Sequence, residues 1–261
     1  MKSNSLSIVV IAQNEADRIS KLLNSAKFAD EIIVVDSGSS DGTQQICKNA
    51  GARVIHQDWL GYVGQKQFAM EAANMCWILN LDADEWLSED GVNEIIAATK
   101  NAEDDVAAFS MPRLSFYLNR WIRHGGWYPD TKIRLVRKGR GRWVGDGIHE
   151  KLEVDGKVIC LYQPILHAVY RNISDQVRTM NSFSTVFAEN RNRPGSMWYV
   201  LLGLLHSFGK FLECYVWKLG IFDGLAGLII AVNSSYYVFL KHAKSWENTL
   251  TDISPSQRKA S

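Results

Sequence analysis

Short apolar runs of strand length alternate with stretches of helical periodicity through the first hundred residues, and this alternation limits the fold more than any other feature. The run 31–35 is rich in β-branched residues, as is typical of a strand buried on both faces of a parallel sheet. Ile19, Leu22, Leu23 and Ala26 recur at the spacing of one helix face. The pattern predicts a doubly wound, mostly parallel α/β sheet, with strands at 6–11, 31–35, 53–55 and 76–81 and helices at 15–27, 39–50 and 65–75.

Polar clusters directly follow three of the predicted strands: Asn14-Glu15, the segment 36–43 and the segment 82–85. Ligands of doubly wound sheets bind beyond the carboxyl ends of the strands, so the clusters are expected to converge on one crevice. We expect the Asp36 carboxylate to point into this crevice and to accept hydrogen bonds from a ribose or a base. The small polar residues after Asp36 fit a capped turn between strand and helix equally well.

Asp82 and Asp84 stand at positions i and i+2 after the predicted strand 76–81. Two carboxylates on a tight loop can bind a divalent cation that phosphate oxygens also hold, and Mg²⁺ and Mn²⁺ prefer such oxygen sites. A solvated acidic turn before a predicted helix at 89–99 is the alternative. The place of the pair at the end of a buried strand favours the cation site.

The composition is that of an ordinary globular protein, with 46% hydrophobic and 22% charged residues and a net charge of +1. Residues 82–105 contain nine acids and one lysine, whereas residues 113–142 contain nine basic residues and one aspartate. Guanidinium groups bind phosphates and aromatic rings stack on sugars, so the basic stretch predicts a site for an anionic glycolipid acceptor or an edge that meets anionic lipid. A solvated positive face is the alternative. No nucleic-acid partner is expected, because opposite charge lies nearby and no binding motif occurs. The basic stretch and its aromatic residues are Arg113, Arg120, Arg123, Lys132, Arg134, Arg137, Lys138, Arg140 and Arg142 with Trp121, Trp127, Tyr128 and Trp143.

Short strands are expected at 107–112, 132–137 and 153–161, and long apolar helices after residue 193. This shift predicts two parts, 1–193 and 194–261. The segment 197–217 is amphipathic and suits a membrane interface, while 224–240 lacks charge over a length at the lower limit for a membrane span. Peripheral attachment is favoured over packing against the chain's own domain or a twin subunit, and over spanning. Four scattered cysteines and the absence of a signal-peptide pattern favour a cytoplasmic protein.

Several motifs together resemble the family 2 glycosyltransferases of GT-A fold. They are Asn14-Glu15, the segment Asp-Ser-Gly-Ser-x-Asp-Gly-Thr at 36–43, Gly64-Gln-Lys66 and Leu-Asp-Ala-Asp-Glu at 81–85. The segments 124–130, Arg134-Leu135, 148–150 and Asp223-Gly224 resemble the lipopolysaccharide core β-glucosyltransferase subgroup, which transfers glucose from UDP-glucose to an inner-core heptose. The resemblance covers roughly residues 5–245. Ala12-Gln13 departs from it, since many relatives carry Thr or Tyr nearby, and this weakens inferences about base contacts there.

The resemblance implies a role for individual residues. Ala12, Asn14, Glu15 and Asp36 would line the uridine pocket, Lys66 would contact uracil or the diphosphate, and Asp82 would touch ribose or metal. Asp84 would ligate Mn²⁺ or Mg²⁺, with His167 as a further ligand and His149 as its rival. Glu150 would act as the general base, and Asp146 is the second choice.

The resemblance leads us to expect an inverting, metal-dependent transferase that moves a hexose, glucose, from a UDP-sugar to an inner-core heptose. It would work on the inner face of the bacterial inner membrane, and a homo-oligomer is left open. Transfer to a polyprenyl phosphate is one alternative, and a non-catalytic membrane scaffold with a transferase fold is another. A serine hydrolase or P-loop enzyme is not expected, and no Walker motif occurs.

Overall fold

The computed structural model describes residues 4–145, 150–189 and 197–251. Contacts between residues divide the chain into two compact units. The first unit comprises Met1–Leu114 and Pro129–Ala168, and the second comprises Ser115–Tyr128 and Val169–Ser261. The compact units thus divide the chain differently from the boundary expected at residue 193, which remains a prediction about functional parts. Each unit is described by itself.

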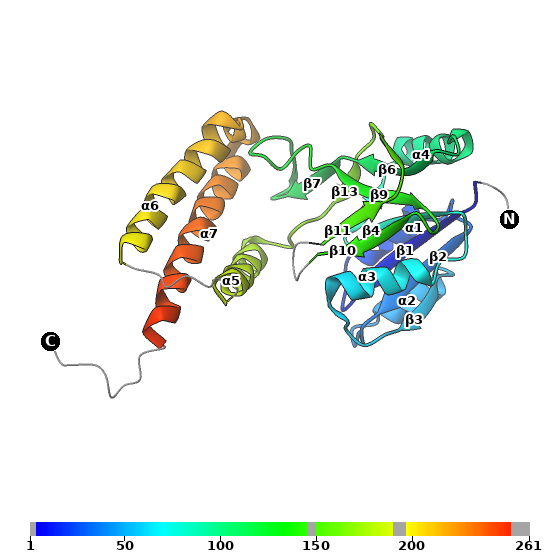
Figure 1. The fold of residues 1–261 in the computed structure, drawn as a ribbon, viewed down its shortest axis with the longest axis horizontal. Helices are drawn as coiled ribbons and strands as arrows, with labels where there is room; N and C mark the ends of the chain where they lie inside the picture. Colours follow the sequence, from blue (N-terminus) through cyan, green and yellow to red (C-terminus); the bar gives the residue numbers. More distant parts are fainter. Residues whose placement is uncertain (1–3, 146–149, 190–196, 252–261) are drawn as a thin grey trace. The chain divides into compact units, whose positions relative to one another are not determined.

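The first unit is built on a seven-stranded sheet in the order β12-β6-β9-β4-β1-β2-β3 (Figure 1). Most neighbouring pairs are parallel, and only β9 runs antiparallel to its two neighbours, β4 and β6. The α/β class with a mostly parallel sheet, which we predict from the sequence, is therefore confirmed. The strands are β1 (Leu6–Ala12), β2 (Glu31–Asp36), β3 (Arg53–His56), β4 (Trp77–Asp82), β6 (Val106–Met111), β9 (Lys132–Arg137) and β12 (Lys157–Cys160).

Both faces of this sheet are covered by helices, because neighbouring residues of a strand point to opposite faces. Ile8 and Val10 of β1 pack into one core cluster with residues of α1, α2 and α4. Val9 packs into a second cluster with Ala69 and Met70 of α3. The unbroken apolar strands thus reflect burial on two sides. The helices are α1 (Ile19–Ser25), α2 (Thr43–Asn49), α3 (Gly61–Glu71) and α4 (Glu89–Asn101).

Two short antiparallel strand pairs complete the first unit. β5 (Glu85–Leu87) pairs with β13 (Ile165–His167), and β10 (Gly141–Val144) pairs with β11 (Lys151–Val154). The single strand predicted at 153–161 was wrong, because the chain turns after β11 and re-enters the large sheet as β12. Gly156 makes this turn with φ +133°, a conformation that favours glycine.

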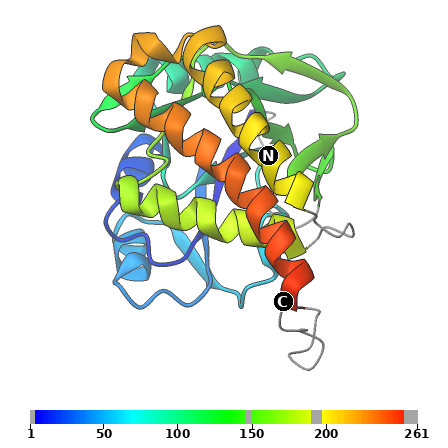
Figure 2. The same cartoon turned by 90° about the vertical axis from the view of Figure 1, so that its left-hand side faces the viewer.

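The second unit combines a β-hairpin with apolar helices. The hairpin joins the end of β7 (Arg113–Tyr117) to β8 (Arg120–Ile122). The helices are α5 (Ile173–Glu189), α6 (Met197–Leu212) and α7 (Gly224–Thr251), with the short turns η1 (Glu213–Trp217) and η2 (Gly220–Asp223) between α6 and α7. α6 (yellow) and α7 (orange to red) lie side by side in Figures 1 and 2. Tyr117 and Ile122 of the hairpin pack on Ala226 and Ile230 of α7, which confirms an apolar helical C-terminal region.

Candidate functional site

The loops after β1 and β2 are joined by hydrogen bonds into one rim of the first unit. The Asn14 backbone N–H donates to Ser39 Oγ at 2.9 Å, and Asn14 Oδ1 accepts from the Ser40 N–H at 2.9 Å. The Glu15 N–H donates to Thr43 Oγ1 at 2.9 Å. Asn14 has φ +56°, a left-handed conformation that asparagine tolerates better than most residues. The structure therefore brings together the polar clusters that follow β1 and β2.

Asp36 is fully buried and its carboxylate organises the turn after β2. The carboxylate accepts hydrogen bonds from the backbone N–H groups of Gly38 and Ser39, from the Ser39 hydroxyl and from Gln44 Nε2 at 2.7 Å. Burial alone would raise the pKa of Asp36, but these hydrogen bonds together lower it below its ordinary value. The geometry is that of the capped turn, so a direct contact of Asp36 with a nucleotide would require some of these bonds to be exchanged.

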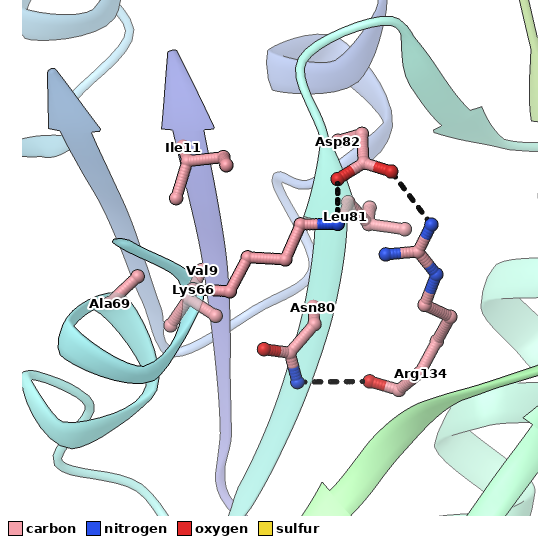
Figure 3. Close-up of a pocket in the computed structure, with 8 residues that line it drawn as sticks. All are labelled: Val9, Ile11, Lys66, Ala69, Asn80, Leu81, Asp82 and Arg134. Atoms are coloured by element: carbon pink, nitrogen blue, oxygen red, sulfur yellow. Dashed lines mark hydrogen bonds and ion pairs between the residues drawn. The ribbon is translucent and has the colours of Figure 1, made fainter. Parts of the chain in front are cut away.

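Lys66 of α3 joins two of the expected site carboxylates. Its Nζ lies 3.0 Å from Asp82 Oδ1 and 3.0 Å from Glu150 Oε1, and it stands over the Trp143 ring at 4.8 Å from the centroid. The Lys66 side chain is nearly buried, so both carboxylates neutralise an ammonium that has little access to water. Figure 3 shows Lys66 reaching across the sheet to Asp82 at the end of β4.

Arg134 of β9 holds the other side of Asp82 (Figure 3). Its Nη2 donates to Asp82 Oδ2 at 2.7 Å and to Glu85 Oε1 at 2.9 Å. Glu85 is fully buried, and its second oxygen accepts from the Asp82 backbone N–H at 3.0 Å. Burial would raise the pKa of Asp82, but Arg134 and Lys66 hold it well below its ordinary value. The Asp82 carboxylate is therefore ionised and fixed at both oxygens.

The charges continue to alternate beyond Glu85. Arg113 Nη1 lies 3.3 Å from Glu85 Oε1, and Arg113 Nη2 lies 2.6 Å from Asp130 Oδ2. Lys132 Nζ lies 3.0 Å from Asp130 Oδ1. Arg134 thus serves as an internal counter-ion, and the expectation that it belongs to a basic acceptor-binding stretch is corrected because it is buried, whereas that expectation stays a prediction for Arg113. Arg134 follows an apolar residue within β9, and a buried cation of this kind needs a carboxylate partner.

Asp84 and His167, the two residues that the family resemblance marks as metal ligands, lie next to each other. His167 Nε2 is 3.5 Å from Asp84 Oδ2, and the same oxygen accepts a hydrogen bond from Arg18 Nη1 at 3.0 Å. Arg18 Nε lies 2.8 Å from Glu15 Oε2 and thereby connects Asp84 to the rim. Sequence reasoning missed Arg18, whose only signal is its place in the loop after β1.

A carboxylate oxygen and an imidazole nitrogen are donors that suit Mn²⁺, and Mg²⁺ sites commonly contain one or two carboxylates completed by substrate phosphates. Within the ranges that the structure describes, no group of three or more Asp, Glu, His or Cys side chains is arranged to hold a metal ion. The pair therefore fits a cation that the substrate would help to coordinate, provided that Arg18 releases Asp84. Asp146 and His149 lie outside the described residues.

A cavity of about 10 Å³ beside Lys66, Asn80 and Arg134 has room for one water molecule. Asn80 lines this cavity and is fixed by two hydrogen bonds. Its Nδ2 donates to the Arg134 carbonyl at 3.2 Å, and its Oδ1 accepts from Trp143 Nε1 at 3.2 Å. Sequence reasoning missed Asn80 and Glu85 as supports of the site. An asparagine inside an otherwise apolar strand was the available signal, because a buried amide requires partners.

The fold and this rim define an α/β protein whose charged residues gather at the carboxyl ends of parallel strands, where this class binds its ligands. Residues 7–152 match the family model described as glycosyl transferase family 2. The match covers more than half of the chain, which therefore belongs to this family and is a glycosyltransferase.

Curated relatives match nearly the whole chain. A lipopolysaccharide core biosynthesis glycosyltransferase of Rhizobium meliloti (strain 1021), LpsC, is 28% identical over 262 residues, which cover 96% of this chain and 95% of that protein. The uncharacterized glycosyltransferase RP128 of Rickettsia prowazekii (strain Madrid E) is 44% identical over 254 residues, which cover 92% of this chain and 86% of that protein. Among solved structures, S. aureus TarS 1-349 is 14% identical with a TM-score of 0.48, over 95% of this chain and 91% of that chain.

Proposed function

We propose that this glycosyltransferase moves a hexose, glucose, from a UDP-sugar to an inner-core heptose of lipopolysaccharide, with inversion at the anomeric carbon. The observation that carries the proposal is the Lys66–Asp82–Glu150 cluster at the end of β4, in a chain that is similar to LpsC over almost its whole length. The Lys66 ammonium lies between two carboxylates, near the carboxyl ends of the parallel strands. An ammonium in such a place can bind the diphosphate of a nucleotide-sugar substrate.

On the donor side, Ala12, Asn14, Glu15 and Asp36 would surround the uridine. Lys66 would exchange a carboxylate for an oxygen of the diphosphate, because a nearly buried ammonium requires an anion in either state. Asp82 would contact the ribose or the metal. Arg134 already fixes its carboxylate, so little ordering is left to be done on binding.

On the acceptor side, Glu150 would take the proton from the attacking hydroxyl. The acceptor oxygen forms a bond to the anomeric carbon while the bond to UDP breaks, and UDP leaves from the opposite face with the electron pair. The carboxylate suits this task, since the hydroxyl becomes acidic as the new bond forms. Release of Lys66 to the diphosphate would free Glu150 for the proton. Asp146 is the second candidate.

Asp84 and His167 would hold the divalent cation, Mn²⁺ or Mg²⁺, after Arg18 moves away from Asp84. When bound, this ion would neutralise the charge that develops on the UDP leaving group.

The acceptor would be an anionic glycolipid at the cytoplasmic face of the inner membrane. The exposed cations Arg140 and Arg142 and the exposed apolar side chains of α6 support this location. By length and composition, the stretch Gly220–Leu250 is the one described helical segment that could cross a membrane, with mean hydropathy 1.3. We favour peripheral attachment over a span. The exposed apolar side chains of α6 would also suit the interface of a homo-oligomer.

The test is an assay of purified protein with a panel of UDP-sugars, Mn²⁺ and heptose-bearing lipid A. We expect UDP release and glycolipid product with UDP-glucose, and a loss of both after treatment with EDTA. Glu150→Gln is expected to lower kcat by about 10²–10⁴-fold while binding of UDP, measured by calorimetry, is retained. Transfer to a polyprenyl phosphate instead would reassign the acceptor, and failure of every UDP-sugar to bind would identify a non-catalytic scaffold.

A further inference from the structure

The connection between α6 and α7 presents a dense group of exposed apolar side chains. We call residues 216–225 the tip. Trp217 and Leu225 are 72% and 71% exposed. A soluble surface seldom shows so many large apolar groups within ten residues, and such patches mark sites of interaction. The exposed apolar residues of the tip are Val216, Trp217, Leu219, Ile221, Phe222 and Leu225.

The tip is held in place by polar contacts beneath it. The buried Asp223 carboxylate accepts hydrogen bonds from the backbone N–H groups of Arg123 and His124, at 3.1 and 2.8 Å. Arg120 Nη1 donates to the Asp223 carbonyl at 2.6 Å, and the Gly125 N–H donates to the Lys218 carbonyl at 2.8 Å. These contacts fasten the tip to β8 and to the segment 123–125 that follows it, so the exposure of its apolar residues is built into the second unit.

Close packing of the backbone has the same effect. A Cβ atom on Gly220 would lie 2.5 Å from the Cys214 carbonyl oxygen, and one on Gly227 would lie 1.8 Å from the Gly220 carbonyl oxygen. Only glycine fits at either place. The backbone is therefore locked while the side chains face outward, which is the arrangement of a preformed binding surface.

The surroundings of the tip indicate its partner. Arg120 and Arg123 are exposed beside it, and Lys218 lies within it, paired with Glu213. α6, which leads into the tip, exposes Trp198, Leu201, Leu205 and Phe208. Apolar and aromatic side chains bordered by cations match the boundary between acyl chains and anionic headgroups of a bilayer.

α7 is tied to α5 by polar contacts at two separate levels. Asn233 Nδ2 donates to Gln176 Oε1 at 2.5 Å, and Lys244 Nζ donates to the Asn181 carbonyl at 2.6 Å and to Thr185 Oγ1 at 2.7 Å. Residues 233 and 244 are about 16 Å apart along a helix. If α7 crossed a membrane, α5 would enter the hydrocarbon with it, including its exposed Arg178. Such a burial of charge is costly.

We propose that the tip enters the interface of an anionic phospholipid bilayer to the depth of its apolar side chains, while the part of α7 after Leu225 stays outside the hydrocarbon and does not span it. This inference deepens the membrane attachment in the proposed function and rests on it. The depth corresponds to the ~5–10 Å that interfacial segments reach.

The test is co-sedimentation of the full chain with vesicles of phosphatidylcholine containing about one third phosphatidylglycerol. We expect the wild type to bind, and alkaline carbonate to release it, as a spanning helix would not be released. The double variant Trp217→Ser/Phe222→Ser is expected to bind these vesicles at least about tenfold more weakly than the wild type does. Tyr162→Ser, which removes an exposed aromatic residue of the first unit, is the matched control and should bind as the wild type does. Circular dichroism of each variant checks that the fold is retained.

Three outcomes would overturn the inference: no binding by the wild type, resistance of bound protein to carbonate, or undiminished binding by the double variant. A dimer in lipid-free solution that the double variant dissociates would assign the tip to a second copy of the chain instead. UDP binding by calorimetry separates this inference from the transfer reaction. The double variant should bind UDP normally, and a wild type that binds vesicles but no UDP would refute the transferase proposal alone.

Discussion

Arg134 shows how a single buried charge supports the candidate site. It is 4% exposed and joins Asp82 to the fully buried Glu85. We expect Arg134→Met to lower the free energy of unfolding by about 3–5 kcal/mol, because it leaves two carboxylates without their shared partner in a region of low dielectric constant. Chemical denaturation with urea measures the change.

Arg142→Met is the matched control, since the Arg142 side chain is 74% exposed and its ion pair with Glu153 is long, at 3.8 Å. Its effect should stay within about 0.5 kcal/mol. The loss of unfolding free energy in Arg134→Lys should fall between those of the two methionine variants, because lysine retains the charge but not the planar guanidinium that reaches both carboxylates. Equal stability of Arg134→Met and Arg142→Met would show that the buried network does not stabilise the fold.

Roles of individual residues could be predicted only where a motif specified them. Asp84 and His167 lie together as the family resemblance implies, whereas Arg18, which contacts Asp84, has no signal in the sequence beyond its neighbours. Arg134 was counted with the basic surface because composition does not distinguish a buried cation from an exposed one. Arg134 is buried because β9 pairs with β4, about fifty residues earlier in the chain, and this pairing brings Arg134 to Asp82.

Secondary structure elements were predicted best where hydrophobic periodicity was unbroken. β1, β2 and β4 lie where the apolar runs placed them, because a strand buried on both faces leaves a continuous pattern. The break between β11 and β12 was missed, because apolar residues on both sides of it resemble one strand. The available signal was Asp155-Gly156, a pair typical of tight turns, and Gly156 has φ +133° at this position.

Gly156→Ala tests this account of the break. Gly156 has φ +133°, and an added Cβ would lie 2.8 Å from the Cβ of Ala107 in β6. We expect a loss of about 2–4 kcal/mol of unfolding free energy, from backbone strain together with overpacking. Gly139→Ala is the control, because Gly139 has φ +80° but open space around it. Gly139→Ala should lose only about 1–2 kcal/mol of unfolding free energy, from backbone strain alone. Thermal and urea denaturation measure both losses. If the two variants lose equal unfolding free energy, the contact with β6 is not what fixes the turn.

The division of the chain into compact units was the least visible from the sequence. Composition changes near residue 194, which predicts parts 1–193 and 194–261. The structure instead groups the distant segment Ser115–Tyr128 with the helices that follow Val169. Tyr117 shows why: its hydroxyl donates to Gln176 Oε1 at 2.7 Å, and its ring packs in one cluster with Ala226 and Ile230. Contacts between residues so far apart in the chain leave no local pattern.

Removal of residues 194–261 therefore has different consequences under the two divisions. If 1–193 folds as an independent part, amide exchange should remain slow throughout it. We expect instead that residues 115–128 lose protection, because Ile122 loses Ala226 and Ile230, and the backbone N–H groups of Arg123 and His124 lose the Asp223 carboxylate. β1, β2 and β4 should keep their slow exchange, since their two core clusters contain no residue after 165. Hydrogen exchange followed by mass spectrometry compares the truncated and full chains, and unchanged protection at 115–128 would favour the boundary at residue 193.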